Sequence, residues 1–183
     1  MAHRTIDQLT AQIDFLREAP AEIGTLELLV IRPANGERTV LDEGVLDEDA
    51  GLVGDTWLQR ATSHAIAEGR HLVAQVNVMS ARMVGLLADT PEEQAGAGDQ
   101  LYLDLDISHA GLPTGSQIAI GDEAVIEVTA KPHNGCKKFL NRFGQDAVDF
   151  VNSELGKELR LRGLNARVVT GGVVRSGDKV RRL

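Results

Sequence analysis

The 183-residue chain has a single cysteine, few aromatic residues and no long apolar run. One cysteine excludes an intrachain disulfide and a cysteine-only zinc site, and it is typical of a reducing cytoplasm. Aromatic residues make up 3% of the chain, which argues against a base-stacking surface for single-stranded nucleic acid. No stretch has the apolar length of a signal-peptide core or a membrane span, so we expect a cytoplasmic protein without membrane partners.

Several motifs that would point to a known chemistry are also missing. There is no Gly-x-Gly-x-x-Gly after the first predicted strand and no Walker A sequence, so nucleotide binding by those routes has no support. The chain also lacks a Gly-x-Ser-x-Gly elbow and a His-Glu-x-x-His pair. The five histidines are scattered, so we expect no structural metal site.

The charge of the chain is unevenly distributed. The formal net charge of −8 argues against broad, non-specific binding to nucleic acid. Residues 1–130 hold 22 acidic and 7 basic side chains, whereas residues 131–183 hold 5 acidic and 12 basic ones. Either the two segments complement each other within one fold, or the second forms a cationic pocket for an anion such as phosphate. The candidate residues for that pocket are Lys137, Lys138, Arg142, Arg160, Arg162 and Arg167.

Short strands separated by glycine and proline dominate the pattern. Strands are predicted over residues 26–31, 39–45, 71–78, 101–107, 117–120, 124–129, 167–170 and 172–174. Helices are predicted over residues 5–18 and 80–87, with two more between 139 and 155 divided at Gly144. We read residues 58–71 and 91–98 as loops, and the alternating strand 101–107 as half-solvated. This pattern favours a mainly β, α+β fold: a closed or nearly closed β-barrel with a few peripheral helices.

The segment around Cys136 carries the clearest chemical signal. Helical spacing begins just after it, which places Cys136 in the first turn of a helix, where the helix dipole favours an anion. Lys137 and Lys138 add positive charge, and both effects favour the thiolate form. Before it, Pro132 favours an extended chain, Asn134 can cap a helix, and Gly135 allows a tight backbone.

A structural role for Cys136 fits the same pattern. Cys136, Leu140 and Phe143 follow helical spacing, so the sulfur can be a small core group. A reactive thiolate can instead attack an electrophile, carry sulfur as a persulfide, or bind a soft metal such as molybdenum. His133 is near in sequence as a partner base, although sequence proximity is weak support for that role.

A series of short stretches gives a family resemblance. They occur in the order 24–31, 51–55, 75–79, 98–101, 112–121, 124–129, 133–139, 162–164 and 171–178. With the single cysteine, this series resembles the MOSC domain family (molybdenum cofactor sulfurase C-terminal domain), in its stand-alone bacterial form. The resemblance spans nearly the whole chain. It implies a single β-barrel domain over residues 24–183, preceded by a helical extension over residues 1–23.

The resemblance also implies site residues and partners. Cys136 matches the hallmark cysteine that carries sulfur or contacts molybdenum, although Gly135 stands where many members have proline. Asp55, Asn77, His133 and Asn134 join the basic residues Lys137, Lys138, Arg142, Arg162 and Arg167 as expected contacts to a molybdenum cofactor. The chain lacks the pyridoxal-phosphate desulfurase domain of the fused sulfurases. We therefore expect no pyridoxal phosphate on this chain, and a separate cysteine desulfurase or electron-donor protein as partner.

Three functions follow from these observations. The first is a sulfur carrier or a molybdenum-cofactor-binding module that uses Cys136 as persulfide or molybdenum ligand. The second is a molybdenum-cofactor-dependent reductase of N-hydroxylated compounds. The third is a non-catalytic interaction domain in which Cys136 is a structural core residue.

Overall fold

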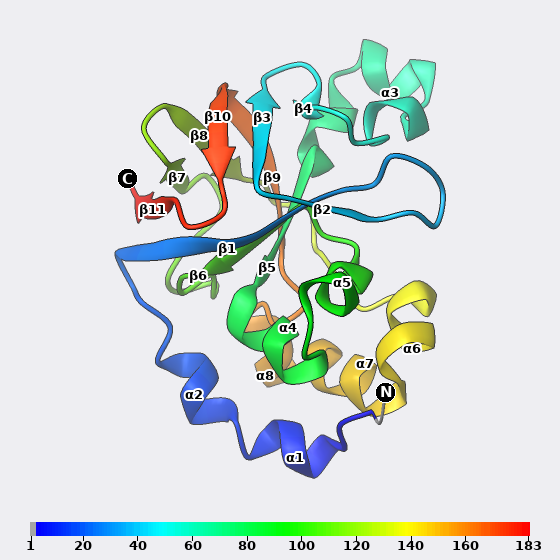
Figure 1. The fold of residues 1–183 in the computed structure, drawn as a ribbon, viewed down its shortest axis with the longest axis vertical. Helices are drawn as coiled ribbons and strands as arrows, with labels where there is room; N and C mark the ends of the chain where they lie inside the picture. The colour runs from blue at the N-terminus through cyan, green and yellow to red at the C-terminus, as the bar shows by residue number, and fades with distance from the viewer. Residues whose placement is uncertain (1–2) are drawn as a thin grey trace.

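The computed structural model describes residues 3–183, and its central feature is a closed seven-stranded β-barrel (Figure 1). The strand order is β11-β7-β8-β9-β5-β6-β1, and β1 pairs again with β11 to close the ring. All neighbouring strands are antiparallel except β5 and β6. The barrel strands are β1 (Ile23–Ile31), β5 (Val76–Ser80), β6 (Leu101–Asp104), β7 (Gln117–Ile120), β8 (Ala124–Val128), β9 (Leu164–Thr170) and β11 (Lys179–Arg182).

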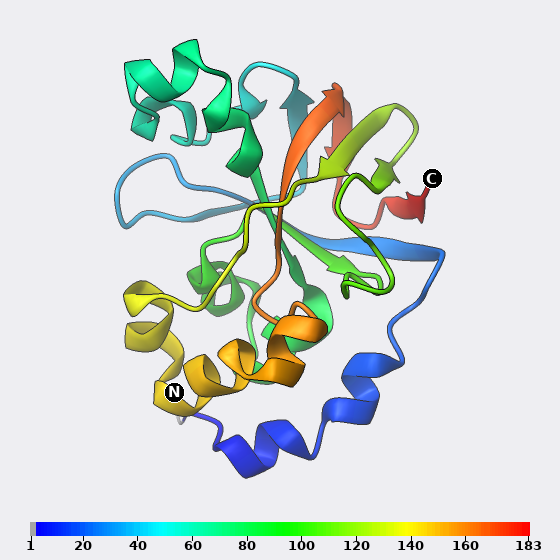
Figure 2. The ribbon, with the colours of Figure 1, turned by 180° about the vertical axis from the view of Figure 1, so that it is seen from behind.

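The remaining strands lie outside the ring. β2 (Thr39–Leu41) pairs antiparallel with the end of β1. A separate three-stranded sheet consists of β10 (Gly172–Arg175), β3 (Glu43–Asp47) and β4 (Gly51–Leu52). Most helices gather at the opposite end of the barrel from this small sheet (Figures 1 and 2). They are α1 (Ile6–Thr10), α2 (Ile13–Arg17), α4 (Ala81–Leu87), α5 (Pro91–Gln94), α6 (Lys137–Phe143), α7 (Gln145–Asn152) and α8 (Glu154–Glu158). α3 (Ser63–Ala67) lies apart from them, near the small sheet.

Two apolar cores explain why β1 and β6 are almost continuously hydrophobic. Leu26, Leu29 and Leu101 point into the barrel core, whereas Leu28 and Tyr102 belong to a second core between barrel and helices. Because both faces are buried, these strands cannot alternate apolar and polar residues. The predicted half-solvated strand over residues 101–107 is therefore wrong: it ends at Asp104, and Tyr102 is fully buried.

The N-terminal segment packs on the second core. Thr5 caps α1 with a capping box, as its position before the helical pattern predicts. The predicted single helix over residues 5–18 is two short helices, and each buries one leucine, Leu9 from α1 and Leu16 from α2. The segment thus lies against the domain rather than apart from it.

Several other element predictions are corrected or confirmed. The predicted loop 58–71 contains the 3-10 helix η1 (Leu58–Arg60), α3 and the start of a second 3-10 helix, η2 (Arg70–Ala74). β5 therefore begins only at Val76. The predicted loop 91–98 is α5 followed by η3 (Ala95–Ala97). Ser80 caps α4 as expected. Gly144 divides α6 from α7 as predicted, with a φ of 85° that favours glycine. Among residues 3–183, no helix is both long and apolar enough to span a bilayer.

Candidate functional site

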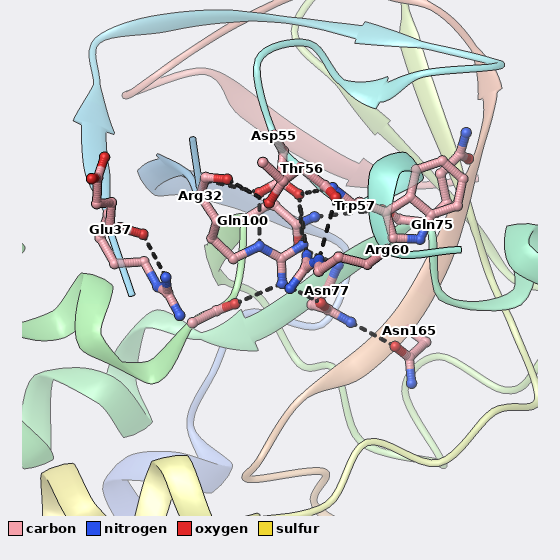
Figure 3. Close-up of polar contacts among 12 residues, drawn as sticks. Arg32, Glu37, Asp55, Thr56, Trp57, Arg60, Gln75, Asn77, Gln100 and Asn165 are labelled. Carbon is pink, nitrogen blue, oxygen red and sulfur yellow. Dashed lines mark hydrogen bonds and ion pairs between the residues drawn. The ribbon is translucent and has the colours of Figure 1, made fainter. Parts of the chain in front are cut away.

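A buried ion pair anchors one end of the site. Arg32 follows β1, and its Nε and Nη2 bond the two carboxylate oxygens of Asp55 at 2.7 and 2.8 Å. The backbone amides of Arg32 and Trp57 donate to the same carboxylate. A bidentate pair with additional backbone donors is the geometry in which a buried pair is well compensated. Asp55 therefore fixes the direction of the Arg32 guanidinium (Figure 3).

A chain of hydrogen bonds links this pair to the cysteine segment. Arg32 Nη1 donates to Asn77 Oδ1 at 3.0 Å, and Asn77 Nδ2 donates to Asn165 Oδ1 at 2.6 Å (Figure 3). Asn165 Nδ2 in turn donates to the backbone carbonyls of Lys131 and Pro132. The sequence therefore brings residues from β1, β5 and β9 together under the segment that leads to Cys136.

A second buried pair holds the same segment at His133. Asp99 is fully buried and bonds His133 Nε2 at 2.6 Å and Arg162 Nη1 at 2.7 Å. Burial alone would raise the pKa of the Asp99 carboxyl, but Arg162 and then His133 outweigh it and hold that pKa below its usual value. The guanidinium of Arg162 also lies 4.9 Å from the centre of the Phe139 ring. Asp99 thus ties the cysteine segment to the second core.

Cys136 itself is exposed and lies at the N-cap of α6, directly before the first turn in which it was predicted. The preceding residue is clamped by α7: Gly135 N donates to Asn152 Oδ1 at 2.9 Å, and Asn152 Nδ2 donates back to Gly135 O. A Cβ at Gly135 would lie 3.1 Å from the Asn152 side chain. The alternative in which Cys136 is a core residue is wrong, because its side chain lies at the surface of an anchored segment.

Two adjacent basic pockets open beside this segment. The first has a volume of about 580 Å³ and the second about 500 Å³, and both are lined by Arg32 and Arg60. The first basic pocket is also lined by Trp57 and His71, whose rings stack with their centres 5.5 Å apart. No carboxylate lines either pocket, and their other cationic residues are Arg38, Arg70, Lys131 and Lys138, with His133 beside them.

Positive charge in these pockets is only partly compensated. Among the described residues, Asp55 pairs with Arg32 and lies 3.5 Å from Arg60, and Glu68 pairs with Arg70, whereas Arg38, Lys131 and Lys138 make no ion pair. Burial, then Arg142 and Arg32, lower the pKa of Arg38, and its Nε is buried without a hydrogen-bond partner among residues 3–183. Burial and Arg32 also lower the pKa of Arg60, against the opposing effect of Asp55. The guanidinium groups therefore repel one another, and an anion placed among them would relieve that repulsion.

The structure distributes the predicted site residues unevenly. Asn77 and His133 line the first basic pocket, and Lys138 lines the second. Asp55 lines neither, but it is bonded to Arg32, which lines both. In the sequence, Cys136 lies between residues 131–133, which line the first basic pocket, and Lys138, which lines the second. Cys136 itself lines neither pocket. The exposed Lys137 follows it.

The remaining predicted residues are engaged elsewhere. Asn134 lines a different pocket and does not cap α6. Arg142 donates to the Gly96 carbonyl, and Arg167 pairs with Glu127 at 2.9 Å on the barrel surface. Arg162 is held by Asp99. Neither basic pocket is lined by any of these four residues.

Sequence reasoning missed the arginines that make the pockets. Arg32, Arg38, Arg60 and Arg70 all come from the acidic part of the chain, so the charge count directed attention away from them. One signal was present: Arg32 directly follows an apolar strand that is buried on both faces. Among residues 3–183, no three histidine, cysteine or acidic side chains are grouped to hold a metal ion.

Comparison with known proteins supports the fold. No family model and no curated protein matches the sequence. The structure is similar to YUAD protein from Bacillus subtilis, with a TM-score of 0.57, 17% identity, and coverage of 86% of this chain and 94% of that one. YiiM from Escherichia coli gives a TM-score of 0.54 and 18% identity over 87% of this chain and 69% of that one. YiiM from Geobacillus stearothermophilus gives a TM-score of 0.52 and 12% identity over 89% of this chain and 73% of that one. The chain therefore has a MOSC-like α+β barrel fold, as the sequence predicted.

Proposed function

We propose that the two basic pockets hold the molybdenum cofactor through its phosphate-bearing pterin, with Cys136 at their edge as molybdenum ligand or as carrier of a persulfide. One observation carries the proposal. In a chain of net charge −8, two adjoining pockets are lined by six lysine or arginine side chains and by no carboxylate of the described residues. Lining residues also flank an exposed cysteine in the sequence, His133 before it and Lys138 after it.

The residues present fit such a group. The buried, unpartnered Nε of Arg38 and the mutually repelling guanidinium groups suit a phosphate, which accepts several charge-assisted hydrogen bonds. Trp57 and His71, which stack on each other and line the first basic pocket, suit contact with an aromatic ring system. Arg38, Arg60 and Lys138 would hold the phosphate. When bound, the cofactor supplies a molybdenum centre for two-electron chemistry, and thiolate sulfur is a soft ligand for such a metal.

The residues of the chain supply orientation and access. Asp55 and Asn77 hold Arg32 in one direction, so its positive charge between the two pockets stays fixed. Asp99 holds the His133 side chain and Asn152 holds the Gly135 backbone, one on each side of Asn134. The exposed Cys136 side chain remains accessible to a partner protein.

Sulfur transfer would come from a separate cysteine desulfurase. The Cys136 thiolate attacks the terminal sulfur of the donor's persulfide, a new S–S bond forms at Cys136, and the donor cysteine leaves as a thiolate. The step needs no external oxidant. In the reductase alternative, a separate electron-donor protein replaces the desulfurase.

Intact-mass spectrometry and metal analysis of freshly purified protein test the proposal. Protein from a host that makes the cofactor should carry near-stoichiometric molybdenum, or a mass increase of one sulfur atom that a reducing agent removes. Cys136→Ser should lose the added sulfur. Arg60→Gln and Lys138→Gln should reduce bound pterin, whereas Arg175→Gln, in an exposed pair with Glu43, should not.

The outcomes separate the alternatives. Molybdenum with reductase activity that is lost in Cys136→Ala supports the enzyme. Metal-free protein that accepts sulfur at Cys136 supports the carrier. A wild-type chain that holds neither molybdenum nor pterin, and accepts no sulfur from a desulfurase, would contradict the proposal.

A further inference from the structure

A third pocket adjoins the first basic pocket. It has a volume of about 250 Å³ and shares Lys131, Pro132 and His133 with the first basic pocket. No carboxylate lines it. Its remaining lining includes Arg160, Lys157, His109, Thr114, Gly156 and Gly163. We refer to it below as the Arg160 pocket.

Arg160 is the unusual residue of this pocket. Arg160 is only 7% exposed, yet no carboxylate among residues 3–183 lies within ion-pair distance of its guanidinium group. Burial is the one cause that lowers the pKa of its guanidinium, so no neighbouring charge offsets it. Burying a charge without a counter-charge is unfavourable, so the chain is expected to retain one where a ligand supplies the counter-charge.

The hydrogen bonds of Arg160 leave part of its guanidinium available. Nη1 donates to the carbonyls of Ile107 and Leu112, which accounts for a structural role. Nε and Nη2 have no partner among residues 3–183, and neither atom is sealed from solvent. Arg160 lines the pocket, and two of its nitrogen donors are without a protein partner among the described residues.

The surrounding charges have the same sign. Lys157 and Lys131 are exposed and make no ion pair with a carboxylate among the described residues. Partial burial and then Arg160 lower the pKa of His109, which also lines the pocket. His133 and Arg162 share the single carboxylate of Asp99 beneath the pocket.

The backbone at Arg160 adds to the cost of keeping it. Its φ of 49° lies in the left-handed region, where it is the one non-glycine residue among those described. Glycine would adopt this conformation with less strain. Both the buried charge and the backbone position are thus unfavourable for arginine in the absence of a ligand.

We propose that the Arg160 pocket binds a small tetrahedral oxyanion, either free phosphate or sulfate or such a group at the end of a small organic molecule, through Arg160, Lys157 and Lys131. The site is distinct from the two basic pockets, except that Lys131, Pro132 and His133 line both it and the first basic pocket. An anion bound there would lie next to the first basic pocket, so a second anionic reactant could be held beside the cofactor.

Isothermal titration with inorganic phosphate, at constant ionic strength with chloride as the replaced anion, tests the site. Glycerol phosphate serves as the organic arm, and tighter binding of it than of phosphate identifies an organic ligand. Backbone amide shifts locate the ion: Gly156 and Gly163 should move on titration, together with the ring of His109.

Variants separate this site from the basic pockets. Arg160→Gln should weaken phosphate binding by about tenfold or more, since hydrogen bonds to charged groups contribute about 1.5–3 kcal/mol. Lys157→Gln, at an exposed position, should weaken it by about threefold without affecting folding. Arg60→Gln should leave the shifts at Gly156 and Gly163 unchanged, even where it abolishes cofactor binding.

Two results would overturn the inference. One is the absence of shifts at Gly156 and Gly163 at phosphate concentrations that saturate any measured binding. The other is equal affinity in wild type and Lys157→Gln, a comparison that holds even if Arg160→Gln fails to fold. Loss of phosphate binding in Arg60→Gln alone would assign the anion to the basic pockets instead.

Discussion

Replacing Asp99 with asparagine should destabilise the fold far more than the same change at the surface. The Asp99 side chain is fully buried, and that of its partner Arg162 is 5% exposed, with a separation of 2.7 Å between nitrogen and oxygen. Removing one partner of a buried pair costs about 3–5 kcal/mol, because the other charge remains buried and uncompensated. For a chain of this size that corresponds to a fall in Tm of about 6–20 °C.

Glu127→Gln is the matched control. Glu127 also forms a carboxylate–arginine pair, with Arg167 at 2.9 Å, but that arginine side chain is 48% exposed. Exposed pairs contribute about 0–1 kcal/mol, so the control should lose at most a few degrees. Thermal and urea unfolding of wild type, Asp99→Asn and Glu127→Gln give the comparison. Equal losses in the two variants would refute the assignment of Asp99 as a buried anchor.

The stability difference between wild type and Asp99→Asn should depend on pH. The pKa of Asp99 is lower in the folded chain than its usual value, so near pH 4 the unfolded chain binds more protons at this group. The stabilisation from Asp99 is therefore complete above the unfolded value of about 3.9 and is lost as the pH falls through the lower folded value. The stability gap between wild type and Asp99→Asn should narrow below pH 4, and a constant gap would contradict this.

Two further predictions concern Cys136 and the glycines. Cys136→Ser should change the free energy of unfolding by less than about 0.5 kcal/mol, since the side chain is exposed; a loss above about 2 kcal/mol by urea unfolding would indicate a core role. Gly163→Ala should be strongly destabilising, because φ is 112° and the new Cβ would lie 2.1 Å from the Val78 carbonyl oxygen. Gly177→Ala, with φ of 91° and nothing within 4 Å, should cost only about 1–2 kcal/mol, and similar losses in both would contradict the predicted clash.

The proposed site could be predicted only in part. Cys136 was named from its local sequence, and Asp55 and Asn77 from the family resemblance. The structure links Asp55 and Asn77 to the cysteine segment by hydrogen bonds. The arginines of the basic pockets were missed because a guanidinium gains its role from distant partners. Arg32 meets Asp55 across 23 positions of the chain, and Asn77 meets Asn165 across 88.

The sequence by itself determined the strand-rich barrel, the helix caps at Thr5 and Ser80 and the break at Gly144, because each depends on local periodicity or on the conformations that neighbouring residues allow. Only the tertiary structure decided which strands are buried on both faces and which charges are left without partners. Burial and electrostatic compensation are properties of residues brought together by strand pairing. Arg160 therefore reads as one basic residue among many in the sequence, and becomes a buried, uncompensated charge only in the folded chain.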